Sequence, residues 1–308
     1  MRRECSYPLL RKALMVLAVC VMSTHAAQAE AVNFPDKNLE AAIRKAINKP
    51  TGDILNTDLI GTGFRVLVAE NAGIIDLAGL EHCTDLMVLA LSNNQISDIS
   101  ALVGLTKLED LYLAKNQISD VSPLAGLTNL NALRLPYNQI SDLSALAGLI
   151  NLTYLDLGVN EISDTSVLAG LFNLQILCLG GNRISDISAL ASLTNLWRLY
   201  LDTNQISDVS ALAGLSNLFF LRLNWNQLSD INALAGLTKL EELKLEGNPI
   251  RGIRSWITIA RIECRRILRA WRASWLPGLV AGLTLFAAVF VALRLWARRV
   301  SKRYTEEP

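Results

Sequence analysis

Asparagine side chains recur at one constant interval through most of this 308-residue chain. An asparagine amide carries two N–H donors and one carbonyl acceptor, so it can satisfy backbone groups that a buried turn hides from water. The regular spacing therefore predicts a ladder in which each side chain bonds its own turn and the neighbouring turn. Consecutive members are 22 residues apart, and the eight are Asn94, Asn116, Asn138, Asn160, Asn182, Asn204, Asn226 and Asn248.

Side chains that could carry out covalent or acid–base chemistry are scarce. The sequence has two histidines, and His25 lies in the predicted signal peptide described below, which leaves His82. A nucleophilic site needs a histidine with partner groups, and nothing near His82 in the sequence supplies them. Cys83, Cys178 and Cys264 show no paired spacing that indicates a metal site or a disulfide framework. We therefore expect no enzyme activity, no catalytic residue, no metal and no cofactor.

A repeated frame positions the asparagines. Each stands in the pattern L-x-x-L-x-L-x-x-N-x-I/L, as in the copy that runs from Leu108 to Ile118. Leu111 and Leu113 alternate with Tyr112, which predicts a short strand with two leucines inward and one tyrosine outward. A fixed period in this range indicates a solenoid of stacked coils. We predict an α/β fold with parallel strands on the concave face.

The return segment of each coil is too short for a full α-helix, so short 3₁₀ turns are expected on the convex face. Ser122 before Pro123 predicts a helical N-cap followed by a proline at the first helical position. The aspartate of the repeated Ser-Asp pair, from Asp98 to Asp230, is expected to cap turns.

The repeats, with the motif NQISDISAL…GLTKLEDLYL, resemble the bacterial internalin-type class of leucine-rich repeats over Ile74–Gly252. Residues 30–73 resemble the helical N-terminal cap of such proteins, with Leu39, Ile43 and Ile47 on one helical face. The resemblance implies a leucine-rich-repeat solenoid at residues 74–252 that serves as a binding module. It does not imply which partner is bound.

Outward strand positions form two predicted columns on the concave face. One column is Ala90, Tyr112, Arg134, Asp156, Cys178, Tyr200, Arg222 and Lys244. The other is Val88, Asp110, Ala132, Tyr154, Ile176, Arg198, Phe220 and Glu242. Tyrosine, tryptophan and arginine dominate binding hot spots, which favours a protein-binding face here. Its predicted residues are Tyr112, Arg134, Tyr137, Tyr154, Arg198, Tyr200, Phe220, Arg222 and Trp225. One alternative is that the outward residues vary without a binding function, because solvent tolerates them. A second is that the ligand is a glycan.

The N-terminal residues 1–29 have the pattern of a secretory signal peptide. A basic start is followed by the apolar run from Ala13 to Met22, and Ala27-Gln28-Ala29 fits a cleavage site. Ten apolar residues are too few to span a bilayer. The repeats are therefore expected outside the cytoplasm.

Near the C-terminus, residues 275–296 have the pattern of a transmembrane helix. Leu276–Leu293 is apolar for 18 residues, and Trp275 and Trp296 bracket it as an aromatic belt. The basic tail at residues 297–308 is expected in the cytoplasm. These features predict a single-pass protein of the cell envelope. The alternative is a surface-sorted protein whose C-terminal span is a processed sorting signal, although no recognisable sorting motif precedes it.

Residues 253–274 form a basic segment between the repeats and the predicted span. Apolar residues such as Ile257, Ala260 and Cys264 follow one another at helical spacing. One reading is an amphipathic helix whose basic face at Arg261–Arg272 contacts anionic lipid. The other is a terminal cap that packs this apolar stripe on the last coil.

The net charge of +1 hides a strong asymmetry. Residues 30–250 hold 13 Lys and Arg against 24 Asp and Glu, a net charge of −11. Residues 251–308 hold 12 basic and 3 acidic residues, a net charge of +9. An acidic repeat domain is a poor ligand for phosphate backbones, so we expect no nucleic-acid partner.

Overall fold

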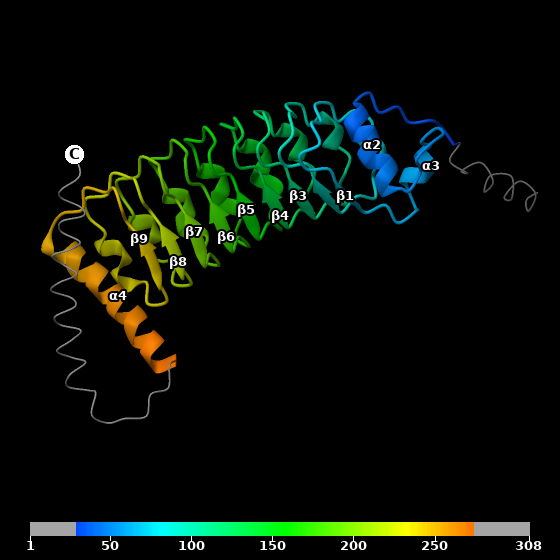
Figure 1. Ribbon diagram of the computed structural model, residues 1–308. Coiled ribbons are helices and arrows are strands. Elements are labelled where there is room, and N and C mark those ends of the chain that lie inside the picture. The colour runs from blue at the N-terminus through cyan, green and yellow to red at the C-terminus, as the bar shows by residue number, and fades with distance from the viewer. Residues whose placement is uncertain (1–28, 274–308) are drawn as a thin grey trace, which may run out of the picture.

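The computed structural model describes residues 29–273 and shows an elongated solenoid with a helix at each end (Figure 1). Its sheet has nine parallel strands in sequence order. The strands are β1 (Val66–Val68), β2 (Val88–Ala90), β3 (Asp110–Tyr112), β4 (Ala132–Arg134), β5 (Tyr154–Asp156), β6 (Ile176–Cys178), β7 (Arg198–Tyr200), β8 (Phe220–Arg222) and β9 (Glu242–Lys244).

The strands stack in register because each coil has the same length. Leu111 of β3 pairs with Leu133 of β4, and every other strand pair has the same offset. The central leucine of each strand from β1 to β8 is fully buried, and the outer two residues face away from the core. The predicted parallel sheet of a leucine-rich-repeat solenoid is therefore confirmed.

Short 3₁₀ helices line the opposite side of the coils, as the sequence predicts. They span Leu80–His82, Ser100–Leu102, Ser122–Leu124, Ser144–Gly148, Ser166–Gly170, Ser188–Ser192, Ser210–Leu212 and Asn232–Gly236. The capping group is the aspartate. Asp120 Oδ1 accepts the backbone N–H of Ser122 at 2.8 Å, and this bond holds the Asp120 pKa below its usual value. Ser122 is therefore not the N-cap that its place before Pro123 suggests, because its own N–H and hydroxyl both donate to Asp120.

The asparagine ladder is present and joins successive coils. In the central coil, Asn160 Oδ1 accepts the N–H of Ile140 at 3.0 Å. Its Nδ2 donates to the carbonyls of Leu135 and Leu157, both at 3.0 Å, so one amide serves two coils. All members except the half-buried Asn138 are buried. Each side chain therefore satisfies backbone groups that water does not reach.

The N-terminal end is closed by α2 (Lys37–Ala46) and α3 (Asn56–Leu59). Leu39 and Ile43 of α2 are fully buried against the first coil, as predicted, whereas Ile47 is the C-cap that follows the helix and is partly buried against the same core. Asp36 joins α2 to the first coil. One of its carboxylate oxygens caps α2 by accepting the N–H groups of Asn38 and Leu39, and the other accepts the N–H groups of Ile75 and Asp76. The sheet also begins earlier than the predicted repeat range, since β1 lies within residues 30–73.

At the other end, α4 (Ile253–Ala273) covers the last coil. Ile259 and Ile262 join the core, and Ser255 and Thr258 are buried beside them. The predicted stripe is wrong at Ile257, whose side chain is 45% exposed.

The polar residues of α4 turn inward because the last coil has no following coil to satisfy its backbone. Ser255 Oγ accepts from Ile231 N and donates to Asp230, at 3.4 and 3.0 Å. Arg265 donates to the carbonyls of Ala235 and Leu237, each at 3.1 Å. The helix therefore caps the stack, as the terminal-cap reading expects, but it buries the face of Ser255, Thr258, Ile259 and Ile262 and not the predicted stripe.

The predicted signal peptide, apart from Ala29, and the predicted span and tail at residues 275–308 lie outside the described residues. Within residues 29–273, no helix is both long and apolar enough to cross a bilayer.

The ladder gives a first testable prediction. Replacing Asn160 with alanine leaves the N–H of Ile140 and the carbonyls of Leu135 and Leu157 without this partner in the centre of the stack. We expect the free energy of unfolding in a denaturant titration to fall by about 1–3 kcal/mol. Gln139→Ala is the matched control, because this neighbouring amide side chain is exposed and should change stability little. Equal losses for the two variants would contradict the ladder's role.

The second prediction concerns Asp36. Burial alone would raise the Asp36 pKa, but four backbone N–H donors outweigh it and hold the pKa below its usual value. A lowered pKa means that the folded state favours the carboxylate. This stability is present above the unfolded-state pKa and is lost as pH falls through the folded-state value. We expect Asp36→Ala to lower stability by about 1 kcal/mol at neutral pH. The difference from the parent protein should shrink in acid, as measured by urea titrations at several pH values.

Candidate binding surface on the concave sheet face

The register of the sheet places the predicted outward residues in two columns. Asp110, Ala132 and Tyr154 stand opposite one another on β3, β4 and β5, and Tyr112, Arg134 and Asp156 do so in the second column. Tyr112, Tyr154, Arg198, Tyr200 and Phe220 are half-buried, whereas Arg134 and Arg222 are exposed. The structure thus brings seven of the predicted binding residues onto one surface.

Arginines of these columns stack on aromatic rings of neighbouring coils. The guanidinium carbon of Arg134 lies 5.5 Å from the ring centre of Tyr154 and 6.0 Å from that of Tyr112. Arg222 lies 4.9 Å from the ring centre of Tyr200. Such contacts attract the cation to the ring face and limit the rotamers of a flexible side chain. Stacking therefore restrains the Arg134 and Arg222 side chains in the absence of a partner.

Tyr137 and Trp225, also predicted, lie just after the strands, along what we call the trailing edge of the sheet. Both are more than half exposed, and both have a left-handed backbone with φ of 58° and 55°. Asparagine or glycine holds this position in some coils, for example Asn93 and Gly181, where the conformation is less strained, whereas Lys115, Val159 and Thr203 hold it in others. A bulky residue here has a conformational cost, and such strain is often kept for function.

Trp225 is also fitted to its neighbour. A Cβ atom added at Gly247 in the next coil would overlap the indole ring, so the ring lies directly over the glycine backbone. Gly247 itself has φ of 70°, a conformation that glycine adopts freely. The position of the exposed indole therefore depends on a glycine in the following coil.

A pocket of about 880 Å³ opens on the trailing half of the concave face. Its lining includes four of the predicted binding residues, which are Arg134, Tyr137, Tyr200 and Arg222. Gly158, Gly180 and Gly181 also line it. The other five predicted residues, Tyr112, Tyr154, Arg198, Phe220 and Trp225, do not line it. The predicted set therefore divides between this pocket and its surroundings.

Titratable groups in the pocket are adapted to burial. Desolvation raises the pKa of Asp156, although Gly158 N–H and Arg134, whose guanidinium lies 3.9 Å away, act in the opposite direction. Desolvation also raises the pKa of the Cys178 thiol, and that of the Tyr154 hydroxyl just outside the lining, each to about 12. At neutral pH Cys178 is a protonated thiol and a weak nucleophile. The pocket has the chemistry of recognition and lacks an activated nucleophile at Cys178.

Two aromatic residues that the sequence analysis overlooked complete a second cluster. Trp197 and Phe219 precede β7 and β8, and Arg198 lies 4.3 Å from the Trp197 ring centre and 4.6 Å from that of Phe220. The Arg198 Nε is buried and has no hydrogen-bond partner in the described chain. Trp197 and Phe219 are separated by one repeat period, so the period itself could have revealed them.

Metal-binding geometry is not seen in the described part of the chain, where no three His, Cys, Asp or Glu residues gather closely enough to hold an ion. His82, the histidine outside the predicted signal peptide, is half exposed and lies 3.8 Å from the carboxylate of its neighbour Glu81. In the described residues, these groups therefore form neither a metal site nor a catalytic site around His82.

Comparison with known families agrees with this architecture. A family model described as "Leucine Rich repeats (2 copies)" matches residues 84–126, 128–170 and 173–214. Leucine-rich-repeat domains are generally protein-interaction modules, and the internalin-like form typically serves as a non-enzymatic scaffold. No curated protein matches the chain.

Solved structures provide further likenesses. The chain is 41% identical to internalin C2 from Listeria monocytogenes, with a TM-score of 0.68 over 71% of this chain and 98% of that one. It is 32% identical to a second internalin from that organism, InlF, with a TM-score of 0.56 over 78% and 84% of the two chains.

A more distant likeness is to the leucine-rich-repeat ectodomain of the Arabidopsis thaliana receptor kinase GASSHO1/SCHENGEN3, which was solved in complex with CASPARIAN STRIP INTEGRITY FACTOR 2. The identity is 26% and the TM-score 0.56, over 63% of this chain and 26% of that one. The bacterial likeness is the stronger in identity and coverage, and with internalin C2 matched along almost its whole length, the chain belongs to the internalin-like leucine-rich-repeat proteins.

Proposed function

We propose that this protein is anchored in a bacterial cell envelope and binds another protein with the concave face of its repeats. The observation that carries the proposal is the set of stacked arginine–aromatic contacts on the outward columns, centred on Arg134, Arg222 and their tyrosines. Ordered arginines and tyrosines are the side chains that dominate binding energy at protein interfaces. Because stacking restrains them before binding, less conformational entropy is lost when a partner docks.

The trailing edge supports the same assignment. Tyr137 and Trp225 expose large aromatic surfaces from a strained backbone position. The core does not need these side chains, since they point away from the buried leucines. Their exposed rings are therefore available to a partner, at a backbone position where glycine or asparagine would be less strained.

The likeness to the plant ectodomain is consistent with a binding role. That ectodomain is a leucine-rich-repeat solenoid captured with a bound ligand. That ectodomain belongs to a plant membrane receptor kinase, and its likeness in fold supports the proposal of a binding role. The partner of the present chain is a separate matter, and we infer only its class.

The membrane part of the proposal rests on sequence. The signal peptide at residues 1–29 would export the repeats, and the span within residues 275–296 would hold them at the membrane with residues 297–308 in the cytoplasm. Helix α4 includes Ala273, the last residue that the structure describes, and the apolar run of the sequence begins at Leu276.

The proposal also includes a lipid contact by the basic segment Arg261–Arg272. Arg265 donates to two carbonyls of the last coil, so this arginine serves the cap. Arg261 and Arg266 are exposed on the same helix. An anionic membrane surface beside the anchor would suit these two side chains.

Alanine substitutions on the concave face test the binding proposal. The full chain in detergent would first be used to capture proteins from envelope and host extracts. Tyr200→Ala and Arg222→Ala should then each lower the affinity for the captured partner by roughly tenfold to thirtyfold in a titration. Because the two side chains stack, their effects on binding should be coupled by about 0.5 kcal/mol or more in a double-mutant cycle.

The matched control is Arg251→Ala, which removes an exposed arginine outside the sheet. This variant should bind like the parent, and circular dichroism should show the same fold for all variants. If both concave variants bind like the parent, the concave face is not the interface.

Protease protection tests the topology. In intact cells or right-side-out vesicles, external protease should digest the repeats and spare a tag placed after Pro308. The chain should stay in the membrane after an alkaline carbonate wash, because a spanning helix is held by its apolar length. Release of the uncleaved chain by the wash would refute the anchor. A mature mass that lacks the C-terminal span would instead favour the processed sorting signal.

A further inference from the structure

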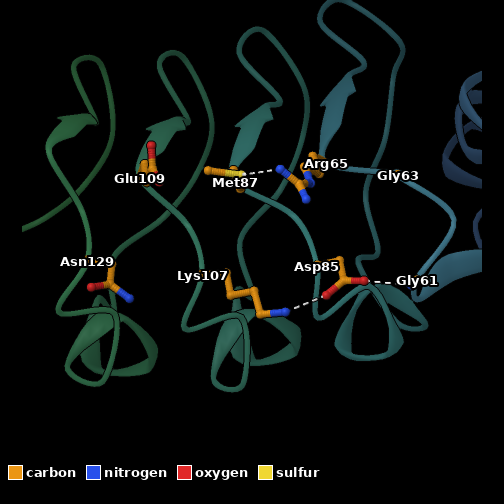
Figure 2. A pocket seen from close by; sticks show the side chains of 8 residues that line it. All are labelled: Gly61, Gly63, Arg65, Asp85, Met87, Lys107, Glu109 and Asn129. Carbon is orange, nitrogen blue, oxygen red and sulfur yellow. Dashed lines mark hydrogen bonds and ion pairs between the residues drawn. The ribbon is translucent and has the colours of Figure 1, made fainter.

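The opposite edge of the sheet, where the strands begin, has a different composition. We call it the leading edge and define it by two rows of residues that precede the strands. The row next to the strands is Arg65, Met87, Glu109, Asn131, Thr153, Gln175, Trp197, Phe219 and Glu241. The outer row is Asp85, Lys107, Asn129, Asn151, Asn173, Asn195, Asn217 and Lys239. Figure 2 shows the first three members of each row. They line a pocket of about 590 Å³.

The outer row contains a second asparagine ladder, this one at the surface. Nδ2 of each asparagine donates to a carbonyl of the preceding coil, as when Asn151 bonds Thr128 and Asn195 bonds Phe172, both at 2.9 Å. The five members are Asn129, Asn151, Asn173, Asn195 and Asn217. These bonds fix each amide plane at the coil spacing of about 4.8 Å.

Much of the hydrogen-bonding capacity of this row is unused. Among the described residues, the Oδ1 atoms of Asn129, Asn151, Asn173 and Asn195 accept no hydrogen bond. Asn217 differs, because Lys239 Nζ donates to its Oδ1 at 2.6 Å. An exposed amide with a free acceptor and a second N–H matches a hydroxyl group, which both donates and accepts.

Aromatic rings stand at one end of this amide row. Trp197, Phe219 and Phe220 pack edge to face, with ring centres 6.1 Å apart for Trp197–Phe220 and 4.8 Å apart for Phe219–Phe220. All three line a pocket of about 490 Å³ together with Gln175, Asn195, Asn217 and Lys239. A rigid ring beside amides suits a ligand that has an apolar face and polar rims.

The charges of the leading edge balance. Arg65, Lys107 and Lys239 are matched by Asp85, Glu109 and Glu241 in the two rows. In the pocket of Figure 2, Lys107 Nζ lies 2.6 Å from the Asp85 carboxylate, which also accepts the N–H of Gly61 at 2.7 Å. A strongly charged polymer would gain little from such a surface, so its chemistry favours an uncharged ligand.

We propose that the leading edge binds a neutral polysaccharide chain. A sugar ring stacks its C–H face on Trp197 or Phe219, and its hydroxyls bond Gln175 and Asn195. Successive sugars of a regular polymer meet successive asparagines of the outer row, which offer the same groups once in every coil. This site lies apart from the pocket on the trailing half of the concave face and does not depend on the protein-binding proposal.

The test uses the full chain in a zwitterionic detergent that carries no sugar headgroup. Neutral β-1,4-linked hexasaccharides of glucose, mannose and N-acetylglucosamine are titrated by calorimetry. We expect at least one to bind, and its trisaccharide to bind more weakly because it meets fewer coils. Trp197→Ala and Phe219→Ala should each weaken binding by roughly tenfold.

Gln175→Ala provides a second variant that does not threaten the fold, because the side chain is exposed and makes no hydrogen bond in the described chain. It should weaken binding by about threefold, a typical loss for one neutral hydrogen bond. Tyr200→Ala, on the other edge, should leave sugar affinity unchanged.

The proposal is overturned if none of the hexasaccharides binds at millimolar concentration. It also fails if Trp197→Ala and Gln175→Ala both bind like the parent. A loss of sugar affinity in Tyr200→Ala that equals the loss in Trp197→Ala would place the sugar on the concave pocket instead. A captured protein whose affinity depends on Gln175, with no sugar bound by the parent, would show that the leading edge is a protein site.

Discussion

The structure depends on one constraint: each coil must find partners for its backbone polar groups in the coil beside it. Strand hydrogen bonds meet this demand on the concave side, and the buried asparagines meet it where the chain leaves the strand. Burial of leucine supplies the driving force but fixes no spacing, because hydrophobic attraction has no direction. The directional bonds of Asn160 and its equivalents set the register, and the register places every outward side chain in its column.

The same constraint explains the two ends. A first coil and a last coil each lack one neighbour, and helices with polar groups supply the missing partners. Asp36 accepts N–H groups of the first coil, and Ser255 and Arg265 of α4 bond the last coil. This is why the buried face of α4 contains serine, threonine and arginine beside isoleucine. An end cap of a solenoid is partly a substitute for a coil.

The repeat period made most of the fold predictable. The constant spacing of the asparagines and the alternation within the strands were enough to place the ladder, the sheet and both outward columns. The face of α4 was not predictable in this way, because an apolar stripe does not reveal that the last coil needs polar partners. Trp197 and Phe219 were overlooked because they precede the strands, where alternation gives no guide to their direction. Whether the concave residues bind a partner is not a property that periodicity encodes.

Parallel, in-register stacking also makes the length of this molecule adjustable. Every internal junction between coils is chemically alike, with leucine on leucine and asparagine bridging to the next backbone. Loss or gain of one whole coil would therefore leave the interior intact and change the length by about 4.8 Å. The outer surface would change at the junction, because different side chains would become neighbours. Without the coil of Tyr154, for example, Ala132 would lie beside Ile176. Unequal recombination between near-identical repeats could thus alter reach and surface together while preserving the ability to fold.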